Sequence, residues 1–479
     1  MPTIYKKTLL FAAIPLLLAG CKKWDDHNAI TDPDVEKNLM QQIQADEGLS
    51  TFAELLVKSG YDKEITSSKT YTVFAPTNTA LQNLDPALVN DAAKLKAFVG
   101  NHIANQLYNS KTALADTVRI PMLNGKFHSL IGTRLDEAAI TRPDKIAKNG
   151  LIHTIDKMLP ALQNTWEVME NDPRIPTVHK TFLQSLYRNV FDAENAEQIG
   201  VNPNTGAPIY KPGTDSVRTN SIWQSVYDVR NEEGQYTMFV LSDEAWAAET
   251  SKIIGYYQTD SVGMPEYFSQ WNVARNTVVE GAYIPSGAGT DTLQSKSGVR
   301  FPVEASAIVH TIKTSNGMVY VLNKMDVLPN QRYRSIVVEG ERYAFTSHDK
   351  RGNTYFRDRY NPLTGTDFKD VLVLNHAQAL FNLAYNVPDV ITTKYKVYWV
   401  AVNDFQTATH QQRISIGTST AGTLPYTVVP VNNFGEQYIG EMTISKFNTS
   451  TLLFLVAANS TSQAVSPLVC DYIRLEPVF

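Results

Sequence analysis

The stretch TYTVFAPTNTAL (residues 70–81) decides the fold of the N-terminal part of the chain. Its first half alternates β-branched and aromatic residues, which is typical of a strand, and Pro76 ends that strand because proline has no N–H to donate. Thr77 or Asn78 can then cap a helix whose apolar face begins at Ala80. The pattern predicts a corner at which a strand passes into a helix.

A similar phrase, YTMFVLSDEAW, returns at residues 236–246, and the segments around both phrases also match in order. The gap from this phrase to the last matching segment is about 80 residues in both copies, which indicates an internal repeat of one domain. The other matching segments are LSTFAELLVKSGY with HKTFLQSLYRNVF, at 49–61 and 179–191, and NGLIHTIDKMLP with NGMVYVLNKMDVLP, at 149–160 and 316–329.

Local signals predict the elements of each copy. Thr51 is a plausible N-cap for a helix in the first copy, and Ser242 takes the cap position in the second copy. Asn149 and Gly150 predict a tight hairpin turn before a returning strand. The second copy carries roughly 35 extra residues, including 200–220, whose Gly, Pro and Asn content predicts a long loop.

These phrases resemble the signatures of the fasciclin (FAS1) family. TVFAPTNTAL is similar to the first signature, NHIANQLY (101–108) to the central segment, and NGLIHTIDKMLP to the second signature. The second copy departs from the pattern, with Asn276 and Thr277 where a His is expected. The resemblance implies two α+β fasciclin domains, at 37–162 and at 163–330 with an inserted loop near 192–222. It also implies adhesion or partner binding, without a chemistry common to the family.

Residues 331–479 have almost no helical periodicity and contain about eight strand candidates separated by polar turns. This pattern predicts an all-β sandwich, most plausibly a jelly roll. Within KYKVYWVAVND, one face would carry Tyr395, Val397, Trp399 and Ala401, and such a stripe is more often core than ligand platform.

The two ends of this region resemble galactose-binding-like jelly rolls, including carbohydrate-binding modules, through VVEGERYAF (337–345) and DYIRLEP (471–477). In some of those modules, acids at the two ends hold a structural calcium. By position these acids would be Glu341 and Asp471, with Glu339 nearby, and carboxylate oxygens suit a hard cation. The alternative is that these acids are exposed or paired on edge strands.

Exposed aromatic residues beside polar groups suit a planar sugar ring. The segment 348–370 is predicted to be a long loop, and two further loops follow at 403–412 and 431–438. The candidate ligand-binding residues on these loops are Tyr355, Phe356, Tyr360, Phe405 and Phe434. The alternative is that these rings plug the ends of the sandwich.

The N-terminus predicts export. Residues 1–20 combine two lysines with a short apolar stretch, as a signal peptide does, and LAGC (18–21) resembles the lipobox of bacterial lipoproteins. We therefore expect lipidation at Cys21 and a polar tether at 21–36. Asp25 and Asp26 resemble the acidic export tags of surface lipoproteins, so the expected location is the outer membrane, facing the cell exterior. Cys470 has no cysteine partner within such a mature chain.

Charge and motifs narrow the function classes. Without its signal peptide the chain would carry 41 basic and 48 acidic residues, a net charge of −7, and no basic patch suggests nucleic-acid binding. Common catalytic and nucleotide-binding motifs are absent, and His102 and His153 occupy positions typical of hydrogen-bonded core residues, so we expect no enzyme and no required cofactor.

Two functions remain open. One is a surface lipoprotein that captures an extracellular glycan, as an accessory of an outer-membrane uptake system of the starch-utilisation type. The other is a protein-binding adhesin, in which the fasciclin domains dock a membrane or extracellular partner and the sandwich is structural.

Overall fold

The computed structural model describes residues 35–66, 69–111, 116–287, 289–418 and 423–479. The expected signal peptide, Cys21 and most of the expected tether lie outside these residues. Within them, no helix is long and apolar enough to cross a membrane. The described residues form two compact units: the first comprises those up to 166 together with 229–235 and 313–317, and the second comprises the other described residues.

The first unit is built on a seven-stranded sheet with the order β2-β1-β7-β6-β5-β4-β3. Its second and third strands, β1 (Tyr71–Pro76) and β7 (Gly150–Ile155), are parallel, whereas β7 and β6 (Ala138–Ala147) form an antiparallel hairpin. The remaining strands are β2 (Ile103–Ala104), β3 (Val118–Pro121), β4 (Phe127–Ile131) and β5 (Arg134–Leu135).

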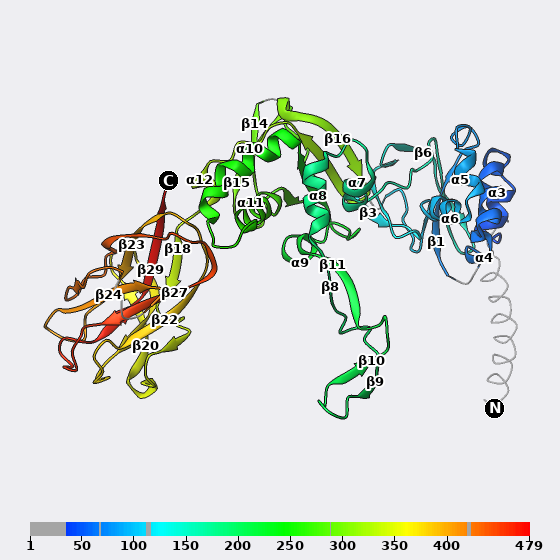
Figure 1. The fold of residues 1–479 in the computed structure, drawn as a ribbon. Coiled ribbons are helices and arrows are strands. Elements are labelled where there is room, and N and C mark those ends of the chain that lie inside the picture. Colours follow the sequence, from blue (N-terminus) through cyan, green and yellow to red (C-terminus); the bar gives the residue numbers. More distant parts are fainter. Residues whose placement is uncertain (1–34, 67–68, 112–115, 288, 419–422) are drawn as a thin grey trace, which may run out of the picture. The chain divides into compact units, whose positions relative to one another are not determined.

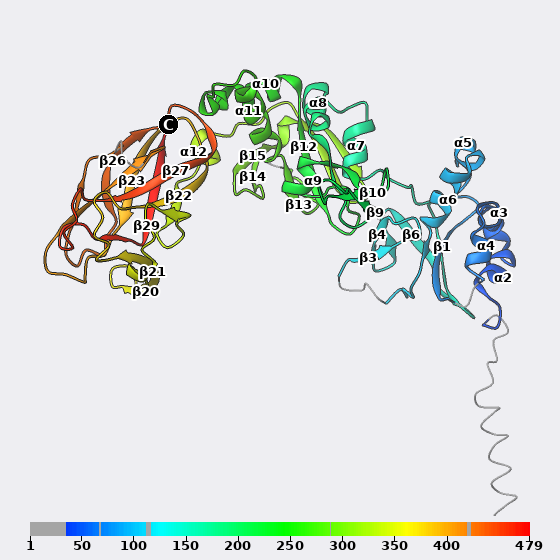
Figure 2. The same cartoon turned by 60° about the horizontal axis from the view of Figure 1, so that its bottom comes forward.

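Helices and a second apolar cluster cover the two faces of this sheet. Tyr71 and Val73 on β1 contribute to a core with the helices, and the next residue, Phe74, contributes to the other core, as strand alternation requires. Figures 1 and 2 show α3 and α6 on one side of β1. The helices are α2 (Leu39–Gln44), α3 (Ser50–Ser59), α4 (Tyr61–Glu64), α5 (Pro86–Asn90) and α6 (Ala92–Gly100).

The predicted Asn-Gly hairpin is present between β6 and β7. The Asn149 side chain accepts a hydrogen bond from the Leu39 N–H at 3.0 Å and donates one to the Ile65 carbonyl at 2.7 Å. At Gly150 a Cβ atom would lie 2.0 Å from the Tyr71 carbonyl oxygen. The residue at this position must therefore lack a side chain for β1 and β7 to pair.

The corner after β1 differs from the prediction. Residues 78–83 form consecutive turns, in which the Thr77 hydroxyl accepts a hydrogen bond from the Ala80 N–H at 3.2 Å. The Asn78 side chain instead accepts from the Thr51 N–H at 3.0 Å, in the first turn of α3. The prediction that Thr51 is an N-cap was therefore wrong, because a side chain from a distant corner supplies the acceptor.

The second unit begins with a reduced version of the same sheet, in the order β13-β12-β17-β16. Its strands are β12 (Tyr236–Leu241), β13 (Val278–Glu280), β16 (Ile308–Thr314) and β17 (Gly317–Leu322), with a separate hairpin of β14 (Thr290–Gln294) and β15 (Arg300–Glu304). Ser242 caps α10 (Asp243–Ile253) through the Ala245 N–H, as predicted. The other helices are α7 (Thr165–Asn171), α8 (Thr177–Ser185), α9 (Ser221–Ser225), α11 (Met264–Ala274) and α12 (Pro329–Arg332).

The insertion near 192–222 is not the irregular loop that its composition predicted. It forms two successive hairpins, β8 (Tyr187–Phe191) with β11 (Ser216–Asn220), and β9 (Gln198–Val201) with β10 (Pro208–Tyr210). Figure 1 shows β9 and β10 beyond the far ends of β8 and β11. Its turn residues mark the reversals between short strands, which is why the composition resembles that of a loop.

The C-terminal region of the second unit is an all-β sandwich, as predicted. Its sheets have the orders β18-β29-β23-β26, β19-β22-β27-β24-β25 and β20-β21-β28. The predicted stripe from Tyr395 to Ala401 is buried, with Trp399 fully inaccessible. The strands are β18 (Ile336–Glu339), β19 (Phe345–Thr346), β20 (Thr354–Asn361), β21 (Thr366–Val373), β22 (Asn382–Val390), β23 (Lys394–Val400), β24 (His410–Ile416), β25 (Thr427–Val429), β26 (Gln437–Thr443), β27 (Asn448–Ala457), β28 (Leu468–Cys470) and β29 (Tyr472–Val478).

Replacing Gly150 with Ala should destabilise the first unit by about 3 kcal/mol or more, because β1 and β7 must separate to admit the methyl group. Urea unfolding followed by circular dichroism measures this change. Lys148→Ala, two residues earlier at an exposed position, is the matched control and should change stability by less than about 0.5 kcal/mol. Equal stability of the two variants would contradict the close approach.

Candidate functional site

The segment 348–370, predicted to be a loop, is mostly the hairpin of β20 and β21, which pair over eight residues from Thr354↔Val373 to Asn361↔Thr366. The turn is closed by the Asn361 side chain, which accepts hydrogen bonds from the N–H groups of Leu363 at 2.9 Å and Thr364 at 3.4 Å. The segment is therefore a regular ribbon whose polar residues are exposed at some positions, such as Asp358, and buried at others, such as Asp370.

Three of the predicted aromatic residues lie on β20 and are about half exposed: Tyr355 at 48%, Phe356 at 54% and Tyr360 at 59%. Alternation along the strand places Phe356 and Tyr360 on one face and Tyr355 on the other. Phe356 also stacks on Tyr343, with the ring centroids 6.2 Å apart. These rings are not buried in the core of the sandwich. Their role as a ligand platform stays a prediction.

Tyr360 borders an open hollow of about 610 Å³ on the hairpin. Its other lining residues are Asp358, Arg359, Asp367 and Phe368. The hollow thus combines aromatic rings with carboxylates and a guanidinium, the groups that orient a polyhydroxylated ligand.

The other two predicted aromatics are held beside this hairpin and are partly buried. The Arg357 guanidinium lies over the Phe405 ring, with Cζ 5.8 Å from the ring centroid. The centroids of the Phe405 and His410 rings are also 5.8 Å apart. The Phe434 carbonyl accepts a hydrogen bond from the Asn361 side chain at 3.1 Å. Phe405 therefore fits the plugging alternative, while the loop of Phe434 supports the end of the hairpin.

Sequence reasoning missed the charged cluster that anchors the hairpin. Arg357 donates to both carboxylate oxygens of buried Asp370, at 2.8 and 2.5 Å, and to Asp404 at 2.8 Å. Arg359 also pairs with Asp404. The sequence signal for this cluster is the spacing of Arg357 and Arg359 in TYFRDRYN, two residues apart. This spacing places both arginines on one face only if the segment is a strand.

The acids proposed for calcium lie where the chain passes between sheets. Gly340 donates its N–H to the Asp471 carbonyl at 2.6 Å, which brings the end of β18 next to the start of β29. Asp471 is buried, and one carboxylate oxygen of Glu341, Oε2, is buried without a hydrogen-bond partner among the described residues. Burial, followed by the charges of Glu339, Asp370 and Glu341, raises the pKa of Asp471 to about 7.

This chemistry fits a hard cation, because the donors are oxygens and the charges of Glu339 and Glu341 help to raise the pKa of Asp471. In the part of the chain that the structure describes, no three His, Cys, Asp or Glu side chains are grouped so that they could hold a metal ion. A calcium ion held by Glu341 and Asp471 would therefore need backbone oxygens or water as further ligands, and would neutralise the cluster. Calcium binding stays a prediction.

The histidines singled out in the sequence are hydrogen-bonded core residues. His102 is fully buried between the Phe98 carbonyl, at 2.9 Å, and the Leu159 N–H, at 2.9 Å, and burial lowers its pKa to about 3. His153 contacts the Tyr108 carbonyl at 2.7 Å, and burial also lowers its pKa. Both side chains therefore serve as neutral links between elements of the first sheet.

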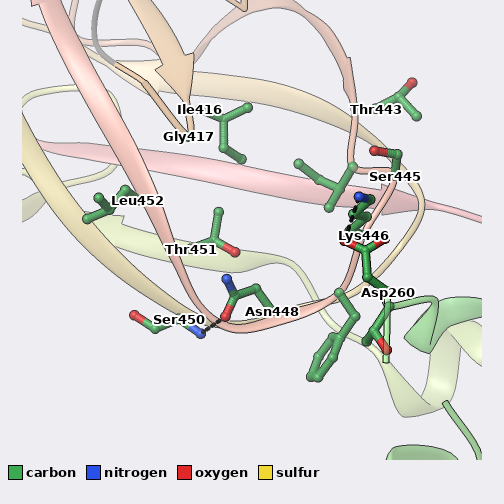
Figure 3. Close-up of a pocket in the computed structure, with 13 residues that line it drawn as sticks. Asp260, Ile416, Gly417, Thr443, Ser445, Lys446, Asn448, Ser450, Thr451 and Leu452 are labelled. Carbon is green, nitrogen blue, oxygen red and sulfur yellow. Dashed lines mark hydrogen bonds and ion pairs between the residues drawn. The ribbon is translucent and has the colours of Figure 1, made fainter. Parts of the chain in front are cut away.

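Another hollow, of about 520 Å³, lies between the segment after β26 and residues Thr259 and Asp260 (Figure 3). Its lysine, Lys446, is paired with Asp260 at 2.7 Å. Its ring, Phe447, packs on Phe268 with the centroids 4.7 Å apart. Arg359 at the hairpin is engaged in the same way, with Asp404. The hairpin is the better candidate because the exposed Tyr360 ring borders its hollow, whereas Phe447 is buried against another ring.

Residues 47–161 match the fasciclin domain family. A heme ligase of Plasmodium falciparum (isolate 3D7) is 28% identical over 155 residues, which cover 26% of this chain and 76% of that protein. The first repeat thus matches the fasciclin domain family, as the sequence phrases predicted.

Two solved structures resemble larger or different parts of the chain. A FAS1 domain pair from the insect cell adhesion molecule Fasciclin I is 14% identical, with a TM-score of 0.24, and covers 60% of this chain and 99% of that one. A family 35 carbohydrate binding module from Clostridium thermocellum is 13% identical, with a TM-score of 0.23, and covers 30% of this chain and all of that one. Because both TM-scores are low, the sandwich is assigned from the strand order described above and not from these two structures.

Stability should depend on pH through Asp471. Its pKa of about 7, against an ordinary value of 3.8, means that the folded state binds a proton more tightly than the unfolded state. The stabilisation is present below about pH 4 and is lost as the pH rises to about 7. Asp471→Asn should therefore stabilise the calcium-free protein at pH 8 by about 2–4 kcal/mol and flatten this dependence.

Calorimetric melting at pH 5 and pH 8, with calcium or chelator, measures both effects. Calcium should raise the melting temperature of the natural chain at pH 8 and leave that of the variant unchanged. Asp358→Asn, at an exposed hairpin position, is the control. A variant that keeps the natural pH slope would show that Asp471 is not responsible.

Replacing Arg357 with Ala should destabilise the sandwich by about 3–5 kcal/mol, because it leaves the buried Asp370 carboxylate unpaired. The double variant Arg357→Met, Asp370→Leu removes both charges and should recover most of the loss. Denaturant unfolding followed by tryptophan fluorescence, to which the buried Trp399 contributes, measures the difference. If the double variant is less stable than Arg357→Ala, the loss comes from packing and not from an uncompensated charge.

Proposed function

We propose that this protein is a non-catalytic surface protein that captures an extracellular glycan on the β20–β21 hairpin. The carrying observation is the hollow beside Tyr360, where an exposed ring lies next to the polar groups of Asp358, Arg359 and Asp367. Sugars present an apolar C–H face and a rim of hydroxyls, which such a combination binds through stacking and hydrogen bonds.

The hairpin is also rigid enough for recognition. Arg357 fixes it to Asp370 and Asp404, so its exposed rings need little ordering when a ligand binds. A site built on paired strands loses less conformational entropy than a mobile loop.

The proposed setting is the outer membrane, with the chain lipidated at Cys21 and facing the cell exterior as an accessory of a nutrient-uptake system. Support comes from the LAGC motif and the acidic residues behind it. Radiolabelled palmitate incorporated by the natural chain and not by Cys21→Ala would test the anchor, and protease shaving of intact cells would test the facing.

The alternative is a protein-binding adhesin. The inserted hairpins favour it, because Phe191, Ile199 and Val201 are each more than half exposed. Exposed apolar residues on a projecting ribbon are typical of a protein contact. Under this alternative the sandwich is structural, and pull-down from outer membranes would recover a partner that depends on this ribbon.

Tyr360→Ala should weaken glycan binding about tenfold or more, since stacking on a ring contributes one to a few kcal/mol and the variant removes the ring. Calorimetric titration of the chain without its first 21 residues, against a panel of polysaccharides, measures the affinity. Tyr438→Ala is the matched control, because Tyr438 is also exposed, at 51%, and lies on β26. Equal losses in both variants, or no binding to any member of the panel, would contradict the hairpin site.

A further inference from the structure

A third hollow, of about 210 Å³, lies within the second repeat and is formed by residues distant in sequence. It is lined by Trp271 of α11 and by Arg275, which directly follows that helix. The other lining residues are Ser225 and Val226 at the end of α9, and Lys296 and Ser297 in the turn between β14 and β15. Sequence analysis assigned none of them a role.

Arg275 is short of hydrogen-bond acceptors. Its Nε atom is buried and has no hydrogen-bond partner in the described part of the chain. The nearest acid to its Nη1 atom is Asp389, whose Oδ2 atom is 3.9 Å away, beyond hydrogen-bonding distance. A buried guanidinium N–H without an acceptor is costly, which points to an acceptor that the chain itself does not supply.

Lys296 places a second cation at the same hollow. Its ammonium donates to the Val226 carbonyl at 2.6 Å and lies 5.0 Å from the Tyr227 ring centroid, so its position is fixed while further N–H groups remain available. Arg334 contacts the Gly298 carbonyl on the neighbouring turn and adds a third positive charge. Arg275, Lys296 and Arg334 thus place three positive charges at or near this hollow, with Asp389 as the acid beside Arg275.

Trp271 gives the hollow an apolar face. It is half-buried and lies one helical turn before Arg275, so the two side chains share a face of the chain at this point. Both also line an adjoining hollow of about 190 Å³, whose other residues include Tyr257, Tyr267 and Phe268. Each space is below the size of ordinary drug-sized pockets, which limits the occupant to a small group.

We propose that the hollow between Trp271, Arg275 and Lys296 binds an anionic sugar residue, a uronate, of an acidic glycan. The sugar ring stacks its C–H face on the indole, and the carboxylate accepts hydrogen bonds from the Arg275 fork and the Lys296 ammonium. The planar carboxylate matches the guanidinium better than a tetrahedral sulfate ester does. This site is separate from the hairpin and shares with the proposed function only the class of ligand.

Calorimetric titration with galacturonate oligomers tests the proposal, using the chain without its first 21 residues. Arg275→Gln and Trp271→Ala should each weaken binding tenfold or more, and Lys296→Gln, an exposed change that spares the fold, at least threefold. Arg300→Gln on β15 is the matched cation control and should leave the affinity unchanged. Methyl-esterified oligomers, which keep the ring and lose the charge, should not bind.

Three further results decide between ligands and between sites. Tyr360→Ala should leave galacturonate binding intact, so failure of the hairpin site and failure of this one are distinguishable. A sulfated oligosaccharide that binds more tightly than the uronate would overturn the carboxylate assignment. Equal binding of esterified oligomers, or an unchanged affinity in both Arg275→Gln and Lys296→Gln, would overturn the site.

Discussion

Both repeats depend on the hydrogen bonds made by the side-chain amide of the Asn in each Asn-Gly pair. In the first repeat, Asn149 links the start of α2 to the segment after α4. In the second, Asn316 accepts from the Thr165 N–H at 2.9 Å and donates to the Val229 and Asn231 carbonyls at 2.9 and 3.0 Å. One amide thereby satisfies a free helix N–H and orphan carbonyls together, which neither apolar nor charged residues can do.

This constraint explains why the repeat is recognisable although its copies differ. The order β2-β1-β7-β6 returns as β13-β12-β17-β16, and the strand after the Asn-Gly turn lies in the centre each time. The corner after the central strand is less constrained. Ser242 starts an 11-residue helix, whereas the same corner in the first repeat forms turns and sends Asn78 to α3. A cap signal alone cannot decide between these outcomes, because the acceptor that a helix end uses can come from a distant segment.

The sequence predicted elements best where burial enforces a pattern. The Tyr395-to-Ala401 stripe and the strand at Tyr71–Pro76 are buried and were recognisable by alternation. The two inserted hairpins and β20 were predicted as loops, since exposed ribbons need no apolar face and their polar residues resemble loop composition. The aromatic candidates were recognisable as residue types. Which of them are exposed on β20, and that Phe405 is packed, depends on Arg357. Its partners, Asp370 and Asp404, come from other strands and loops.

Buried charge explains how the second repeat passes into the sandwich. Arg332, in the last helix before β18, pairs with Glu249 of α10 at 2.8 Å, and both side chains are inaccessible to solvent. Arg332 also donates to Asn272 at 3.2 Å, while Glu249 accepts from Lys252 at 2.6 Å. A pair of this kind adds little net stability, yet either charge alone would be strongly unfavourable, so the two must bury together. The helix that carries Asn272 also carries Trp271 and leads into Arg275. The same ion pair that fixes the start of the sandwich therefore also fixes the helix that leads into Arg275, whose Nε atom has no hydrogen-bond partner among the described residues.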